Sequence, residues 1–146
     1  MTARFFDTSA LGRAFFEDED GHVELRAWIL DENAPTLIST LVRLEFVATC
    51  EALARGGRIP DAGLYIARLD ALLVERFANI VAFDAEIIPV AERILRRRQL
   101  RTLDALHVAT ALAAQDSRHP PTDEVIFVTR DHAQADAARA EGLTVA

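Results

Sequence analysis

Residues 4–11 read RFFDTSAL, an apolar run that ends on a bare carboxylate and continues into two hydroxyls and a helix-forming stretch. The two phenylalanines predict a short buried strand over residues 4–7, because aromatic residues favour strands. A helix is expected from about residue 9 to 16, with Thr8 or Ser9 as its cap. Asp7, at the junction, therefore either caps this helix or forms one wall of a site.

Short apolar segments and helical patterns alternate through the rest of the chain. Further strands are expected at residues 36–39, 79–84, 125–129 and 143–146. Further helices are expected at residues 22–32, 41–55 (with Thr40 as a cap), 61–76, 85–98, 102–115 and 131–142. This alternation predicts an α/β fold with a parallel sheet covered by helices on both faces. Because no repeat or linker interrupts it, we expect one domain over residues 1–146.

The composition excludes several classes of protein. Hydrophobic residues make up 51% of the 146 residues, which is too many for a disordered chain. No apolar run approaches the roughly 18 residues of a membrane span, and Asp7 interrupts the N-terminal apolar stretch too early for a signal peptide. Cys50 is the only cysteine, which excludes an internal disulfide. We therefore expect a cytoplasmic protein without membrane association.

The charge of the chain bears on its partners. The net charge is −7, which argues against a nonspecific nucleic-acid coat. It does not exclude nucleic-acid chemistry, because a bound metal can offset a carboxylate-rich site. All 16 basic residues are arginine. Arginine forms bidentate pairs with phosphate, although a GC-rich coding sequence would produce the same bias.

Four acids fall where such a fold places a ligand site, at the carboxyl ends of the strands. Asp7 ends the first strand, and Asp131 lies two residues past the strand VIFVT. Glu45 and Asp104 sit early in helices that start near the same edge. Singly, Asp7, Asp104 and Asp131 also fit as helix caps, whereas Glu45 lies inside a largely apolar helix and is harder to explain in that way.

Together the four acids predict metal chemistry. Carboxylates gathered in one place repel and raise one another's pKa values. A bound Mg²⁺ or Mn²⁺ relieves that repulsion, and oxygen ligands suit these hard ions. Such ions activate water and stabilise a reacting phosphodiester. We therefore expect metal-assisted cleavage of a phosphate ester.

Four stretches resemble the PIN-domain ribonucleases, most closely the VapC-type toxins of bacterial toxin–antitoxin pairs. They are FFDTSAL, LVRLEF, LRTLDALHVATAL and VTRDHAQADAARAEGL, whose order and spacing fit that family over essentially the whole chain. The resemblance implies a three-layer α/β/α fold with a mainly parallel sheet. It also implies an endoribonuclease that depends on Mg²⁺, with Mn²⁺ as a substitute.

The resemblance carries over to individual residues. The acidic quartet of the family is matched by Asp7, Glu45, Asp104 and Asp131, with Asp7 and Asp104 as the first choices for metal ligands. The hydroxyls beside the first acid are matched by Thr8 and Ser9, and Thr129 would support the fourth acid. Some relatives carry a further acid near the fourth. Here Asp136 would face away from Asp131, so the number of metals stays open.

The same resemblance implies partners. These are an RNA substrate, a second copy of the chain in a homodimer, and a cognate VapB-type antitoxin. The antitoxin's C-terminal segment would lie across the apolar helices near residues 41–54 and 61–76 and block the site. Those helices also fit as parts of the core.

Arginines and a histidine near the acids allow two interpretations each. The stretch RILRRRQLR at 93–101 is either a solvated helix end, where cations suit the dipole, or a track for RNA phosphates. The weaker candidates for RNA contact are Arg43, Arg96, Arg97, Arg98 and Arg101. His107 is either a packed, hydrogen-bonded helix residue or a general base. A zinc site is not expected, because the ligand spacing is missing.

Other functions compete with the nuclease. A phosphatase of the haloacid dehalogenase class also begins with a strand ending in aspartate, but it needs a second aspartate where Ser9 stands, and a lysine. A response-regulator receiver also needs a lysine, and this chain has none. A non-catalytic PIN-like module that only binds RNA or protein stays open.

Overall fold

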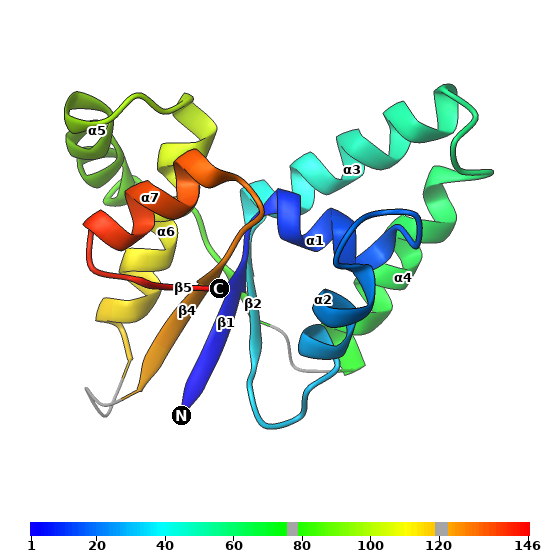
Figure 1. The fold of residues 1–146 in the computed structure, drawn as a ribbon, viewed down its shortest axis with the longest axis horizontal. Coiled ribbons are helices and arrows are strands. Elements are labelled where there is room, and N and C mark those ends of the chain that lie inside the picture. The colour runs from blue at the N-terminus through cyan, green and yellow to red at the C-terminus, as the bar shows by residue number, and fades with distance from the viewer. Residues whose placement is uncertain (76–78, 119–122) are drawn as a thin grey trace.

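A five-stranded parallel sheet forms the centre of the computed structural model, which describes residues 1–75, 79–118 and 123–146 (Figure 1). The strands are β1 (Thr2–Phe6), β2 (Thr36–Ser39), β3 (Asn79–Val81), β4 (Glu124–Val128) and β5 (Thr144–Val145). Their order is β3-β2-β1-β4-β5, and every pairing is parallel. Because the chain leaves β1 for β2 on one side and returns through β4 on the other, the topological switch lies between β1 and β4.

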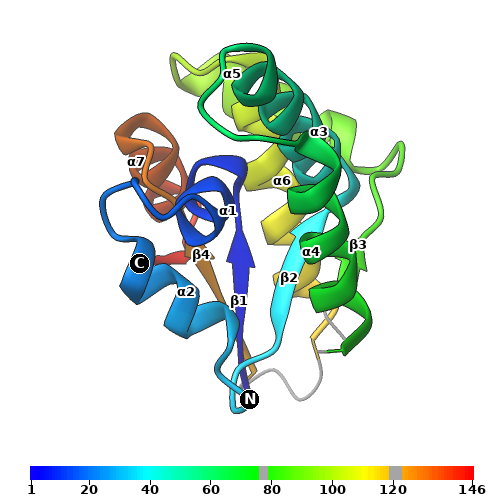
Figure 2. The same cartoon turned by 90° about the vertical axis from the view of Figure 1, so that its right-hand side faces the viewer.

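Seven helices in the described ranges cover the two faces of the sheet (Figures 1 and 2). They are α1 (Thr8–Phe15), α2 (His22–Ile29), α3 (Thr40–Arg55), α4 (Ala62–Glu75), α5 (Ile87–Arg97), α6 (Thr102–Asp116) and α7 (His132–Ala140). Helices α1 to α4 lie on one side and α5 to α7 on the other. The three-layer α/β/α arrangement expected from the sequence is confirmed.

The alternation of side chains along β1 divides the core into two parts. Phe6 packs into the cluster beneath α1 to α4, while its neighbour Phe5 packs into the cluster beneath α5 to α7. Successive strand residues point to opposite faces, so both phenylalanines are fully buried. Phe5 also stacks on Phe127, its partner in the β1–β4 register, with ring centroids 5.8 Å apart.

Several local expectations differ from the structure. Asp7, not Thr8 or Ser9, caps α1, and Ser39, not Thr40, caps α3. In both cases the chain passes from strand to helix without a loop. The last extended residue therefore stands three positions before the amide that its side chain accepts. The strand expected at 79–84 ends at Val81. The cap position of α6 is Arg101, which makes no side-chain cap bond.

Helix α3 buries one face against the core and leaves large apolar side chains exposed on another. The buried residues are Val42, Phe46 and Cys50, whereas Leu44 is 65% exposed. Phe46 packs edge-on against Phe15 at 5.1 Å between centroids, which joins α3 to α1. The residues described here include no helix long and apolar enough to cross a membrane.

Phe46 and Leu44 provide a test of this packing. Truncating Phe46 to alanine opens a cavity between α1 and α3, so Phe46→Ala should lower the free energy of unfolding by about 3–5 kcal/mol. Leu44→Ala, two residues away on the same helix, should change it by no more than about 0.5 kcal/mol. Denaturant unfolding measures both. A large loss in Leu44→Ala alone would contradict the orientation of α3.

Candidate active site

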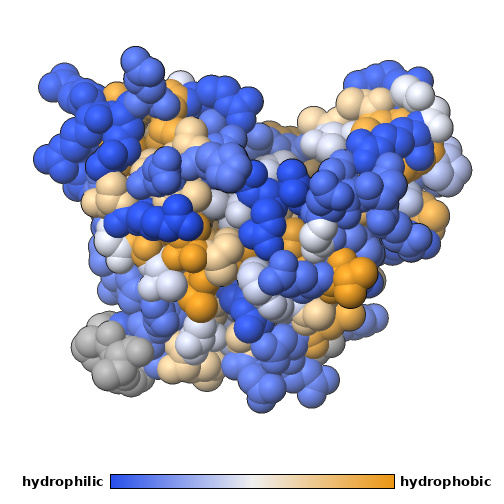
Figure 3. Space-filling view, viewed as in Figure 1, coloured by the Kyte–Doolittle hydropathy of each residue, from blue (hydrophilic) through white to orange (hydrophobic). Residues whose placement is uncertain are grey.

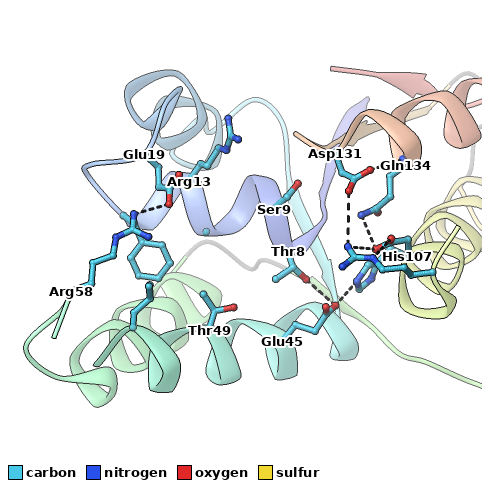
Figure 4. A pocket seen from close by; sticks show the side chains of 15 residues that line it. Thr8, Ser9, Arg13, Glu19, Glu45, Thr49, Arg58, His107, Asp131 and Gln134 are labelled. Atoms are coloured by element: carbon cyan, nitrogen blue, oxygen red, sulfur yellow. Dashed lines mark hydrogen bonds and ion pairs between the residues drawn. The ribbon is translucent and has the colours of Figure 1, made fainter. Parts of the chain in front are cut away.

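A cavity of about 350 Å³ opens at the end of the molecule where the strands β1, β2 and β4 finish. The space-filling view shows a hollow with mainly hydrophilic borders between the α5–α7 side and the α3–α4 side (Figure 3). Its inner end is bordered by Thr8, Ser9, Glu45, Arg101, Asp104, His107, Asp131 and Gln134 (Figure 4). Its outer end is bordered by Arg13, Glu19, Thr49 and Arg58, among others.

Asp7 lies directly behind this cavity and is fully buried. Its carboxylate accepts hydrogen bonds from Ser9 Oγ at 2.8 Å, from Thr129 Oγ1 at 2.5 Å and from the amide of Ala10 at 2.9 Å. Burial raises the pKa of Asp7, against the lowering effect of these hydrogen bonds. Asp7 therefore has the first of the two roles that the sequence left open, because it caps α1, and it lies behind the cavity without bordering it.

Hydrogen bonds through Thr129 join the first acid to the fourth. Thr129 follows β4, as Asp7 follows β1, and the paired register places the two residues side by side. The same Oγ1 that donates to Asp7 accepts the amide of Asp131 at 3.0 Å. Asp131 in turn caps α7, accepting the amide of Gln134 at 2.9 Å. The two strand ends are therefore connected side chain to side chain.

The turn that carries Asp131 is also held from its outer side. The amide of Arg130 donates to Ser9 Oγ at 2.9 Å. The Arg130 guanidinium lies 5.7 Å from the centre of the Trp28 ring and 3.4 Å from Glu24. This packing against α2 fixes the direction in which Asp131 faces.

Glu45 reaches the cavity from the second turn of α3. Its Oε1 accepts hydrogen bonds from Thr8 Oγ1 at 3.0 Å and from Nε2 of the buried His107. Burial acts to raise the pKa of Glu45, but the hydrogen bonds from His107 and Thr8 and the nearby positive charges outweigh it and hold the pKa below its ordinary value. His107 is thus a packed, hydrogen-bonded residue, one of its two expected roles, and it orients Glu45.

Asp104 lies in the first turn of α6 and is held by two neighbours. Arg101 donates from Nε to Oδ2 at 2.8 Å and from Nη2 to Oδ1 at 3.3 Å. Gln134 donates from Nε2 to Oδ1 at 3.1 Å. The Nη2 of Arg101 also lies 4.0 Å from Asp131 Oδ2. One guanidinium therefore stands between the third and fourth acids, and its bonds to Asp104 raise the pKa of Arg101.

The donor set fits a hard divalent cation. Three carboxylates, from Glu45, Asp104 and Asp131, border one cavity, and two of them already share a positive group. Oxygen ligands of this kind suit Mg²⁺ or Mn²⁺. As the side chains lie, no group of three or more acids, histidines or cysteines in the described ranges is gathered tightly enough to be a preformed ligand set. Asp7 does not border the cavity itself.

The other predicted arginines lie apart from the cavity. Arg43 forms a two-pronged ion pair with Asp70 and so joins α3 to α4. Arg96 pairs with Glu92 at 3.3 Å on the exposed end of α5, and Arg97 and Arg98 follow it there. None of the four borders the cavity.

Sequence reasoning missed several residues of the site. Gln134 has a sequence signal, because an aspartate cap followed three residues later by glutamine is the capping-box spacing. Its side chain bonds Asp104 instead of the backbone of its own cap. Arg58 has no such signal. It pairs with Asp18 at 2.9 Å and Glu19 at 2.7 Å, across two loops that are far apart in the sequence. Asp136 is exposed, as expected.

The parallel three-layer fold, with acids at its switch point, defines the class of protein. The family model of the PIN domain matches residues 4–140, and the chain belongs to that family. The fold is similar to the crystal structure of VapBC2 from Rickettsia felis bound to a DNA fragment from the promoter, with TM-score 0.67 and 16% identity over 100% of this chain and 98% of that one. It is also similar to VapBC-1 from nontypeable Haemophilus influenzae, with TM-score 0.66 and 13% identity over 100% and 97% of the two chains. No curated protein matches the chain significantly.

Asp7 provides a test of the electrostatics of the site. Because burial raises its pKa, the folded protein binds a proton that the unfolded chain has released, so stability falls as pH rises from about 4 to the raised pKa. Asparagine caps helices as well as aspartate does and carries no such proton. Asp7→Asn should therefore match the wild type at low pH and melt at a higher temperature at pH 7, in a chelator.

The thermal midpoint between pH 4 and 8 is the measurement. Asp136→Asn removes an exposed carboxylate of α7 and is the control, which should show no gain that grows with pH. A marked fall in the midpoint of Asp7→Asn at pH 7 would instead mean that the charge at Asp7 stabilises the fold.

Proposed function

We propose that this PIN-domain protein is a metal-dependent endoribonuclease, the toxin of a toxin–antitoxin pair, which hydrolyses RNA phosphodiester bonds. The observation that carries the proposal is the convergence of Glu45, Asp104 and Asp131 on one cavity from three separate elements. Asp7 stands behind them and is linked to Asp131 through Thr129. Membership of the PIN family supports a nuclease.

Each residue has a task in this proposal. Asp104, Asp131 and Glu45 would hold Mg²⁺ or Mn²⁺, and Asp7 would add its charge from behind or bind the ion directly. When bound, the ion supplies a Lewis acid and lowers the pKa of water. His107 and Thr8 aim Glu45 at the cavity, while Ser9 and Thr129 hold Asp7 in place. Gln134 holds Asp104.

The proposed partners follow from the family and from the surface of α3 and α4. The similar structures are VapBC complexes, which supports a VapB-type antitoxin as the partner of this chain. Leu44 and Leu64 expose apolar surface on α3 and α4, where the antitoxin segment would lie. We propose a homodimer that acts on RNA in the cytoplasm.

Metal dependence is the first test. Mg²⁺ or Mn²⁺ at millimolar concentration should raise the thermal midpoint by mass action and support RNA cleavage, whereas Ca²⁺, with its looser geometry, should support little. Asp104→Asn should lower the cleavage rate at least roughly 100-fold. Even mutation of a residue that only hydrogen-bonds to a metal ligand can lower activity by that factor. Asp136→Asn, the charge-matched control on α7, should cleave normally.

The non-catalytic alternative makes the opposite prediction. The geometry supports this alternative, because two of the carboxylates already accept hydrogen bonds from the protein. Asp104 accepts from Arg101 and Gln134, and Glu45 accepts from His107. No thermal shift with Mg²⁺ and no cleavage would favour a binding module. Full cleavage in a chelator would reject the metal mechanism itself.

The arginine block provides the second test. If Arg96, Arg97 and Arg98 follow RNA phosphates, changing all three to glutamine should weaken binding and flatten its salt dependence, by roughly 0.7 in the log–log slope for each lost contact. Cleavage at saturating RNA should change much less. The control replaces three exposed arginines elsewhere with glutamine: Arg55, Arg68 and Arg139. Equal slopes in the two triple variants would exclude the block from the RNA path.

A further inference from the structure

Arg101 pairs locally, as Arg96 and Arg139 do, but the acids that it meets border the cavity. Arg43 and Arg58 connect residues 27 to 40 positions away and so hold separate elements together. Arg101, at the N-terminal cap of α6, pairs closely with Asp104 three residues later and only approaches Asp131 at 4.0 Å. Its side chain is 80% exposed. The side chain of Asp104 is only 9% exposed, so the pair joins a solvent-exposed guanidinium to a buried carboxylate.

The Arg101 guanidinium lies where its positive charge offsets the negative charge of the acids. It bonds both oxygens of Asp104 and faces Asp131, and its charge also acts on Glu45. Those are the three carboxylates that border the inner end of the cavity. In the described ranges, no other arginine forms an ion pair with any of the three. A metal ion that takes these oxygens must compete with Arg101 for the same lone pairs.

We infer that Arg101 is a built-in counter-cation that the metal displaces, and that the released guanidinium then binds a phosphate of the RNA at the site. This inference rests on the proposed function. The side chain is long, exposed and anchored at the mouth of the cavity, one residue before α6 begins. A guanidinium pairs with phosphate through the same two-pronged geometry that it uses with Asp104. Arg101 thus couples metal loading to substrate binding.

The first experiment measures metal affinity without RNA. Calorimetric titration with Mn²⁺ should give binding to Arg101→Gln at least roughly two- to fivefold tighter than to the wild type, because even a fully exposed ion pair contributes up to that much. Arg13→Gln is the control. Arg13 borders the same cavity and carries the same charge, but it bonds the carbonyl of Asp20 instead of the acids. Its removal should leave the Mn²⁺ affinity close to that of the wild type.

The second experiment measures RNA binding at several salt concentrations, with Ca²⁺ to limit cleavage and in parallel with a chelator. With Ca²⁺, Arg101→Gln should bind RNA more weakly than the wild type, with a log–log salt slope flatter by roughly 0.7. In the chelator, the wild type and Arg101→Gln should have similar salt slopes for RNA binding, because the Arg101 guanidinium then stays paired with Asp104. The same substitution is thus expected to strengthen metal binding and weaken RNA binding.

The outcomes separate this inference from the proposed function. Mn²⁺ binding by the wild type with equal or weaker binding by Arg101→Gln overturns the inference and leaves the nuclease proposal intact. Equal tightening in Arg101→Gln and Arg13→Gln also overturns it, because general charge would then explain the effect. An unchanged RNA slope with Ca²⁺ overturns the second step. Absence of Mn²⁺ binding in every protein rejects the metal-dependent function itself.

Discussion

The parallel pairing of β1 with β4 is the constraint on which the rest of the site depends. It runs in register from Thr2 opposite Glu124 to Phe6 opposite Val128, so Asp7 and Thr129 leave the sheet at the same level. The hydrogen bond from Thr129 to Asp7 then crosses the switch point between the two strands. A buried carboxylate needs such donors, because an unpaired charge in the interior is very costly. The stability of the fold and the placement of the first and fourth acids therefore have the same origin.

The architecture was accessible from the sequence because it depends on repeating patterns. Short apolar strands alternate with amphipathic helices, and VIFVT and RFFD show both members of the central pair. The four acids were also accessible, because they follow strands or lie in the first two turns of helices that start at one edge. Their positions in the chain translate directly into positions in the fold.

Other features depend on contacts that no local pattern encodes. The leucines and alanines of α3 do not indicate which of its faces is buried, because alanine fits both a core and a surface. The pairing of Arg58 with Asp18 and Glu19 depends on how two loops meet. The hydrogen bond between His107 and Glu45 joins residues 62 positions apart. The cap at Ser39 was misplaced by one residue, and the cap of α1 stayed open between Asp7 and its two neighbours, because strand and helix adjoin without a loop.

Because Arg130 packs against Trp28, tryptophan fluorescence can report on the turn that carries Asp131. Trp28 is the only tryptophan in the chain, and its ring lies near the guanidinium groups of Arg4, at 5.6 Å, and Arg130, at 5.7 Å. Indole emission responds to nearby charge and to hydration. Arg130 directly precedes Asp131, so a shift of that turn changes the environment of the indole while the fluorophore itself stays outside the cavity. Events at the acids can thus be followed by intrinsic fluorescence, without any attached dye.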